Sequence, residues 1–298
     1  GGCGACKFEL VEGEVDTLWP DAPGLSERDR RRGRHLACQC RALGPVRIKA
    51  PGGAEYVPRI RPARQTARLA GITDLTHDIR EFRFVTNSPA SFLPGQYAML
   101  DLPGVGTSRA YSLSNTANDG GEWHFQIRRV PHGQGTHVLF DKLKAGDEIG
   151  LDGPYGVAWL RTGAPRDIVC VAGGSGLAPM VSIARGAAAA GMLKDRKLYF
   201  FYGARTPRDV CGAEMLAQLD GFGERIIYLP VVSLPGGEGE WQGETGYVHD
   251  AVARTLPGSL AGFEFYFAGP PPMTQALQEM LMVGHRVPFE QIHFDRFF

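Results

Sequence analysis

The stretch Arg109-Ala110-Tyr111-Ser112-Leu113-Ser114 places a cation, a flat ring and a hydroxyl close together in the chain. Side chains alternate between the two faces of a β-strand, so Arg109 and Tyr111 share one face while Ser112 points to the other. An arginine can pair with a phosphate, a tyrosine can lie against a planar heterocycle, and a serine can hydrogen-bond a ring nitrogen. A flavin nucleotide requires all three contacts, but an ordinary strand with one exposed arginine fits this short pattern too. The stretch alone leaves both interpretations open.

Short alternating segments on both sides of this stretch predict a small antiparallel barrel. Glycine, proline and aspartate turns separate them, as is typical of an all-β domain. The predicted strands are 66–72, 79–86, 96–102, 108–115, 123–130 and 148–152.

A second phosphate-binding element is predicted further along the barrel. Pro131-His132-Gly133-Gln134-Gly135-Thr136 leads into a helix expected at 137–142, with Thr136 as its cap. Glycines before a helix expose backbone N–H groups and the positive end of the helix dipole to an anion. Gly135 and Thr136 therefore favour a flavin diphosphate, although a plain helix cap after a hairpin is the alternative.

From Pro165 onward the pattern changes to alternating strands and helices. Ile168–Ala172 is a continuous apolar run, as a strand buried on both faces requires, and it leads through glycines into an alanine-rich helix ending near Gly191. Such alternation predicts a doubly wound parallel sheet. The further strands are expected at 198–202, 226–232 and 263–268, with helices at 211–219, 247–254 and 272–283.

Three turns of this sheet are predicted to bind a dinucleotide, because dinucleotides bind at the carboxyl ends of parallel strands. They are 173–178, 203–206 and 269–273. The first turn lacks the complete G-x-G-x-x-G pattern, so it is a weak signal taken alone. The candidate contacts are Gly174, Gly176, Gly203, Arg205, Gly269, Pro270 and Met273.

Two close cysteine pairs mark the first fifty residues. Plant-type [2Fe–2S] domains hold their irons with C-x4-C-x2-C and one distant cysteine. Cys3 and Cys6 match the second and third of these ligands and Cys38 matches the fourth, so the first would precede Gly1. We therefore expect the chain as given to begin inside the cluster loop. The alternative is a structural zinc site that also uses Cys40.

Two segments near these cysteines are expected to be irregular. The dense charges of 27–35 predict a solvated turn, with a basic docking patch for an acidic electron-transfer partner as the alternative. Prolines and glycines in 45–62 predict no regular element, and a linker is expected there at 51–63. Cys170 and Cys211, further along, are expected to be unreactive.

Composition excludes several classes of function. Lys+Arg and Asp+Glu both number 32, so no global charge attracts nucleic acid or an anionic membrane. The most apolar helical segment, 177–190, contains Arg185 and is too short to span a bilayer, and no basic, apolar leader opens the chain. We expect a cytoplasmic protein. No Ser/His/Asp order or metal-binding histidine pair indicates hydrolysis.

In their order and spacing these motifs resemble the reductase components of bacterial aromatic-ring oxygenases, within the ferredoxin-NADP-reductase-like superfamily. The likeness to naphthalene-type systems covers the whole chain. It implies an N-terminally incomplete β-grasp ferredoxin at 1–50, an FAD-binding barrel at 64–162 and an NAD(P)-binding α/β domain at 163–298. The motifs that carry it are Pro94-Gly-Gln-Tyr97, Arg109-Ala110-Tyr111-Ser112, Gly174-Ser-Gly176-Leu-Ala-Pro179 and Asp295-Arg-Phe297.

The resemblance also implies roles for single residues. Ser112 would hydrogen-bond the flavin near N5, Thr136 would contact its phosphates, and Phe297 would cover the ring face where nicotinamide enters. FAD is favoured over FMN by the resemblance only. Ala268 departs from the family, which usually has a cysteine facing the nicotinamide, and this leaves the efficiency of hydride transfer in doubt.

The implied function is electron transfer. Reduced nicotinamide gives two electrons as a hydride and a [2Fe–2S] centre accepts one at a time, so a flavin must stand between them. The electrons would pass to a terminal oxygenase or its small ferredoxin. The alternatives are a flavin-only reductase with a vestigial cluster module, the reductase of a di-iron monooxygenase, and a nucleotide-binding regulatory module with structural zinc. Segment 203–209 does not decide between NADH and NADPH.

Overall fold

The computed structural model describes residues 4, 6–53, 57–236 and 241–297. They belong to two compact units, one within Gly1–Arg59 and Arg296–Phe298, the other Ile60–Asp295. No helix among the described residues combines the length and apolar character that a bilayer crossing needs.

The first unit is built on two small antiparallel sheets. In one, β1 lies between β3 and β5, and in the other β2 pairs with β4. Ala22, Leu25 and Leu36 form its buried core, against which Cys6 packs. The strands are β1 Lys7–Glu12, β2 Val15–Thr17, β3 Arg34–Leu36, β4 Cys40–Ala42 and β5 Arg47–Lys49.

Two expectations for this unit were wrong. The charged segment 27–35 is not a solvated turn, because helix α1 (Glu27–Arg31) forms there behind a capping box of Ser26 and Asp29. Asp29 is buried and also pairs with Lys7 and Arg34. Nor is 45–62 without regular structure, since β5 pairs there with the edge of β1.

The barrel of the second unit has six antiparallel strands in the order β10-β7-β6-β11-β8-β9. A bridge between Leu113 and Phe125 joins the two edge strands, so the barrel is nearly closed. Phenylalanine, leucine and Trp123 side chains fill its interior. The strands are β6 Ala63–Asp74, β7 Ile79–Val85, β8 Tyr97–Asp101, β9 Arg109–Ser112, β10 Glu122–Arg128 and β11 Glu148–Tyr155.

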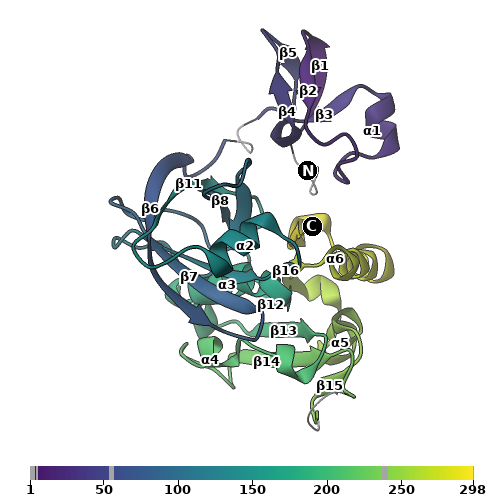
Figure 1. The fold of residues 1–298 in the computed structure, drawn as a ribbon. Coiled ribbons are helices and arrows are strands. Elements are labelled where there is room, and N and C mark those ends of the chain that lie inside the picture. Colours follow the sequence, from purple (N-terminus) through teal and green to yellow (C-terminus); the bar gives the residue numbers. More distant parts are fainter. Residues whose placement is uncertain (1–3, 5, 54–56, 237–240, 298) are drawn as a thin grey trace. The chain divides into compact units, whose positions relative to one another are not determined.

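The same unit contains a parallel sheet in the order β15-β14-β13-β12-β16-β17, as the doubly wound pattern predicts. Helix α3 packs on β12 and β16 and also contacts β10 of the barrel, whereas α5 and α6 pack together elsewhere on the sheet (Figure 1). The strands are β12 Asp167–Gly173, β13 Leu198–Ala204, β14 Ile226–Val232, β15 Glu244–Thr245, β16 Phe263–Gly269 and β17 Ile292–Arg296. The helices are α2 Gln134–Asp141 in the barrel, α3 Leu177–Ala189, α4 Ala213–Leu216, α5 Val248–Thr255 and α6 Pro271–Gln278.

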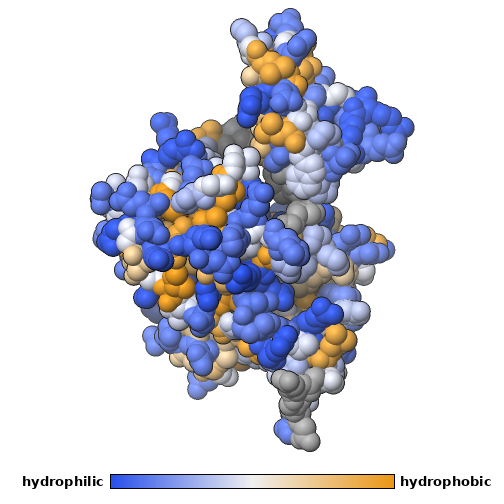
Figure 2. Space-filling view, in the orientation of Figure 1, coloured by the Kyte–Doolittle hydropathy of each residue, from blue (hydrophilic) through white to orange (hydrophobic). Residues whose placement is uncertain are grey.

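The surface of the first unit carries both charge and apolar side chains. The helix α1 is strongly hydrophilic, and apolar side chains gather over β1 and β5, where Val11, Val46 and Ile48 are exposed (Figure 2).

Candidate functional site

The residues Arg109–Ser112 form the barrel's edge strand β9. Ser112 is 8% exposed and pairs with Tyr97 of β8, while Arg109 and Tyr111 are half-buried and Ala110 is exposed. Burial raises the pKa of Tyr111 to about 12, although the Arg109 charge opposes the shift. The phenol is thus protonated even in alkaline solution and can lie against an uncharged ring.

The first turn of α2 meets this strand. A Cβ on Gly135 would lie 2.8 Å from the Tyr111 hydroxyl and 3.2 Å from Cγ of Arg109, so any larger residue would displace these two side chains. The guanidinium of Arg109 donates to the Thr107 carbonyl oxygen at 3.2 Å and also bonds the Thr107 hydroxyl. A cation and a helix N-terminus thus converge beside a tyrosine ring, which fits the diphosphate and ring of a flavin nucleotide.

Helix α2 begins earlier than the sequence predicted. Gly133 is its N-cap and Thr136 its third residue, so the expectation that Thr136 caps the helix was wrong. The Thr136 hydroxyl instead accepts from the Val130 backbone N–H at 3.2 Å and can donate to the carbonyls of Val130 and Gly133. It fixes the turn that leads into the helix.

The three predicted turns of the parallel sheet lie side by side. The register pairs Gly173 with Gly203 and Ala172 with Ala268. A Cβ on Gly176 would lie 1.9 Å from the Ala268 carbonyl oxygen. Backbone groups rather than side chains therefore line this edge of the sheet, as a nucleotide phosphate requires.

The other candidates of this sheet surround the same edge. Met273 packs so closely on the first turn that a Cβ on Gly173 would be 2.7 Å from its sulfur. Pro179 is buried in the first turn of α3, and Pro270 is the N-cap of α6. Phe297 directly follows β17, at the chain's C-terminal end.

Sequence reasoning missed Arg128, which comes from the barrel strand β10. It lies 3.4 Å from the position of a Cβ on Gly174, and its Nε donates to Asp78 at 2.6 Å. Together with Arg205 and Asp209 it lines a small cavity of about 20 Å³ beside the nucleotide turn. Alternation along β10 offered a signal, because it places the charged Arg128 on one face with the polar Gln126.

Asp209 is held in place beside this cavity. Although burial opposes its ionisation, hydrogen bonds from the Thr206 hydroxyl and backbone N–H, with the nearby Arg128 charge, hold its pKa below the usual value. His77 approaches it to 3.7 Å. A fixed negative charge therefore stands near Arg205.

The described cysteines of the first unit lie together. The Cys6 sulfur donates to the Cys38 sulfur at 3.3 Å, and this hydrogen bond lowers the pKa of Cys38 to about 5 against the opposing effect of burial. Two neighbouring sulfurs, one of them readily ionised, suit an iron–sulfur cluster. Cys3 lies outside the described residues, and Cys40 begins β4 opposite Thr17.

The remaining cysteines are as unreactive as expected. Cys170 is fully buried in β12, and burial raises its pKa well above the ordinary value. Burial also raises the pKa of Cys211 to about 11. Neither thiol ionises at physiological pH.

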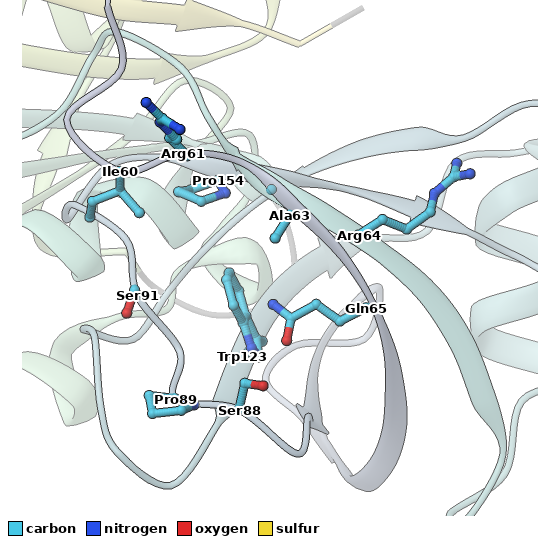
Figure 3. A pocket seen from close by; sticks show the side chains of 11 residues that line it. Ile60, Arg61, Ala63, Arg64, Gln65, Ser88, Pro89, Ser91, Trp123 and Pro154 are labelled. Carbon is cyan, nitrogen blue, oxygen red and sulfur yellow. The ribbon is translucent and has the colours of Figure 1, made fainter.

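A pocket of about 320 Å³ opens elsewhere on the barrel, where β6 begins and β11 ends, and its lining includes none of the predicted flavin contacts. Figure 3 shows the ring of Trp123 between Ser91 and Gln65, whereas Arg61 and Arg64 extend away from the pocket. Neither arginine points into the pocket (Figure 3), so it offers no preformed phosphate contact of the kind that Arg109 makes possible.

Comparisons with known proteins agree with this geometry. Family models match three successive segments: a 2Fe-2S iron-sulfur cluster binding domain over 1–43, an oxidoreductase FAD-binding domain over 66–159 and an oxidoreductase NAD-binding domain over 170–279. The fold and these segments define an iron–sulfur flavoprotein that oxidises a nicotinamide nucleotide.

Relatives and solved structures give the family. Ferredoxin–NAD(P)+ reductase CarAd of Metapseudomonas resinovorans is 45% identical over all of this chain and 89% of its own length. The reductase component of the naphthalene 1,2-dioxygenase/salicylate 5-hydroxylase systems of Ralstonia is 35% identical, covering 100% and 88%. The structure of the ferredoxin reductase in carbazole 1,9a-dioxygenase matches with a TM-score of 0.88 at 41% identity, over 100% of this chain and 87% of that one.

The chain belongs to the ferredoxin–NAD(P)+ reductase components of multicomponent oxygenase systems. Its cofactors are FAD, a nicotinamide nucleotide and a [2Fe–2S] cluster, and it transfers electrons from the reduced nicotinamide nucleotide to an oxygenase or to the ferredoxin of an oxygenase system. The resemblance inferred from the motifs is thereby confirmed. Iron–sulfur chemistry, rather than structural zinc, is the function of the first domain.

Proposed function

We propose that this chain reduces the oxygenase of an aromatic-ring dioxygenase system and that it acts in the cytoplasm. The relatives named for carbazole and naphthalene dioxygenases support this assignment. An alkene monooxygenase reductase of Xanthobacter autotrophicus, 39% identical, makes a monooxygenase the second candidate. The observation that carries the electron-transfer function is the approach of Gly135 to Tyr111 and Arg109, which makes one cradle for a dinucleotide flavin.

In the proposed site, β9 and α2 hold the flavin. Arg109 and the first turn of α2, including Gly135 and Thr136, bind its diphosphate. Tyr111 packs against its ring, Ala110 leaves the exposed face of the strand clear, and Ser112 donates to the ring from its buried position. The bound flavin supplies the conversion of a two-electron hydride into single electrons.

The nucleotide is proposed to lie along the glycine turns. Backbone N–H groups at Gly174, Gly176 and Gly203 face its phosphates, and Arg128 adds a positive charge from the barrel. Pro179, Gly269, Pro270 and Met273 shape the nicotinamide end, and Phe297 covers the flavin until nicotinamide enters. Cys3, Cys6 and Cys38 are the proposed iron ligands present in this chain. The domains are proposed at 1–50, 64–162 and 163–298, with 51–63 as the linker.

NADH rather than NADPH is the proposed donor. The 2′-phosphate of NADPH would bring two negative charges toward Asp209, which is ionised and fixed by Thr206. Arg205, exposed on the same edge, is left to hydrogen-bond the ribose hydroxyls. We expect Asp209→Asn to raise kcat/KM for NADPH about tenfold relative to NADH, and an unchanged ratio would contradict this role.

The system assignment is tested by reconstitution. The purified chain is mixed with NADH and, separately, with the oxygenase components of a carbazole dioxygenase, a naphthalene dioxygenase and an alkene monooxygenase. We expect oxygenated product in at least one dioxygenase mixture and faster turnover there than with the monooxygenase. Product with the monooxygenase alone would reverse the assignment, and no bleaching of the flavin by NADH would contradict the proposed site.

A further inference from the structure

Helix α3 begins at the nucleotide turn, and its middle is attached to the flavin barrel. Ser182, Arg185 and Gly186 are spaced i, i+3 and i+4, so they lie on one face of the helix. That face meets two barrel segments, 94–95 and 114–115.

Ser182 bonds both barrel segments at once. Its hydroxyl donates to the Asn115 carbonyl oxygen at 2.6 Å and accepts from the Gly95 backbone N–H at 3.3 Å. The side chain is fully buried, so water does not compete for either bond.

Arg185 adds a charged contact one turn later. It donates from a guanidinium nitrogen to the Ser114 carbonyl oxygen at 2.9 Å. Burial lowers the pKa of Arg185, and the negative charge of Glu81 opposes this shift. Glu81 also accepts from Gln126 and from the Ser114 hydroxyl, so Ser114 is held from both sides.

Gly186 lets the helix approach the barrel closely enough for these bonds. A Cβ there would lie 2.4 Å from Cγ of Pro94 and 2.8 Å from its Cβ. The residue is in the interior of a helix, where glycine is otherwise less favourable than alanine. Close packing against Pro94 explains its presence.

The attached segments flank the proposed flavin strand. Ser114 is two residues beyond Ser112, about 7 Å along an extended chain, and Gly95 stands two residues before β8. On the helix side, Ser182 is six residues beyond Gly176, about 9 Å along the axis. Short lengths of regular backbone therefore connect the hydrogen bonds of Ser182 and Arg185 to the nucleotide turn on one side and to the proposed flavin strand on the other.

We infer that Ser182, Arg185 and Gly186 are positioning residues, which set the distance between the nucleotide turn and the flavin strand for hydride transfer. The inference rests on the flavin and nucleotide sites proposed above. Hydride transfer requires its donor and acceptor atoms, a nicotinamide carbon and a flavin nitrogen, within about 3–3.5 Å, and a misplacement of about 1 Å can reduce the rate about 100-fold. Because helix α3 is hydrogen-bonded to the barrel and begins at the nucleotide turn, it can hold the two sites within that range of distances.

Three variants of the full chain test the inference. Gly186→Ala inserts a methyl between helix and barrel while favouring the helix itself, Ser182→Ala removes the two-way bond, and Arg185→Met removes the charged contact, for which Arg185→Lys is the conservative rescue. Thr86→Val is the matched control. Its buried hydroxyl likewise donates to a carbonyl, of Ser88, and accepts from an N–H, of Trp123, but within the barrel alone.

The measurements separate positioning from folding and binding. They are the FAD content, the dissociation constant of NAD+, the unfolding midpoint, the anaerobic rate of flavin reduction by NADH, and its isotope effect with NADH deuterated at the transferred position. We expect Gly186→Ala and Ser182→Ala to slow flavin reduction about 10- to 100-fold with a larger isotope effect, while the NAD+ dissociation constant changes less than about threefold. Arg185→Lys retains more of the rate than Arg185→Met.

The rate of flavin reduction in the control variant Thr86→Val distinguishes positioning from a general loss of stability. Thr86→Val is expected to lower the unfolding midpoint as Ser182→Ala does and yet to reduce its flavin at the wild-type rate. Equal rates in all variants, or a loss that merely follows FAD content, would overturn the positioning role. A wild-type flavin that NADH does not reduce would instead overturn the proposed sites.

Discussion

The barrel and the parallel sheet of the second unit present their binding groups in different ways. In the barrel, side chains of β9 supply the cation, the ring and the hydroxyl. In the sheet, the proposed contacts are backbone N–H groups of three glycine turns, and side chains would obstruct the close packing of those turns. The barrel site should therefore be sensitive to the removal of a side chain, and the sheet site to the addition of a methyl group.

The largest effect is expected from Gly176→Ala. The new Cβ would lie 1.9 Å from the backbone oxygen of Ala268, which cannot rotate away. Overpacking of this kind should reduce the free energy of unfolding by about 3 kcal/mol and abolish NAD+ binding. Urea unfolding and NAD+ titration measure both, with Gly262→Ala as control because nothing lies within 4 Å of its added methyl. Normal NAD+ affinity in Gly176→Ala would contradict the claim that the nucleotide site of the sheet is sensitive to an added methyl group.

Arg109→Ala tests the barrel side. Loss of a charge-assisted contact to the diphosphate should weaken FAD binding by about 2 kcal/mol, roughly 30-fold. The unfolding midpoint of the chain without FAD should hardly change, because Arg109 is not in the core. Titration of FAD into the apoprotein measures the affinity, and the exposed Arg68 of β6 provides the control Arg68→Ala. Equal FAD affinity in both variants would contradict the proposed diphosphate site.

Gly135→Ala sharpens the comparison, because this glycine belongs to the barrel but, like the glycines of the sheet, leaves too little space for an added methyl group. The methyl group would press on the Tyr111 hydroxyl and should weaken FAD binding about fivefold. Alanine also favours helix α2 by up to about 1 kcal/mol. We expect lower FAD affinity together with an equal or higher unfolding midpoint; a fall in both would mean that the methyl disrupts the fold instead.

Asp29→Asn extends the comparison to the first unit, where the Asp29 side chain stabilises the fold instead of binding a cofactor. Hydrogen bonds from Lys7 and Ser26 hold the pKa of Asp29 far below its usual value, so its unfolded-state pKa, about 4, is the higher of the two. Its stabilisation is fully present above that value and is lost as pH falls toward the folded-state pKa. Calorimetry should find the variant less stable by about 1 kcal/mol at pH 7, with a smaller difference at pH 3. The exposed Asp21→Asn is the control, and a difference independent of pH would exclude this role.

Alternation and turn residues were sufficient to predict the barrel and the sheet. Each predicted strand from Thr66 to Ala268 has its counterpart, and the three turns meet because parallel strands end at one edge. Arg128 could not be predicted in the same way. Alternation along β10 places Arg128 on the outer face, but its position beside Gly174 depends on how β10 packs against the nucleotide turn.

The first unit shows why local patterns can also mislead. Ser26 and Asp29 have the spacing of a capping box, yet the surrounding arginines suggested a solvated turn. Asp29 makes an ion pair with Lys7, far away in sequence. Strand β5 is three residues long, too short for alternation to be recognised among prolines and glycines, and it forms because β1 has a free edge to pair with.

That pairing has a consequence for the kinetics of electron transfer. Because β5 ends at Lys49 and β6 begins at Ala63, the thirteen residues 50–62 join these two strands, and they include most of the proposed linker 51–63. Fully extended, this segment spans at most about 45 Å. As the proposed linker, a segment of that length would keep the iron–sulfur unit at an effective concentration on the order of millimolar around its own flavin unit. Dilution of the protein should therefore slow delivery of electrons to the oxygenase but not transfer from flavin to cluster within one chain.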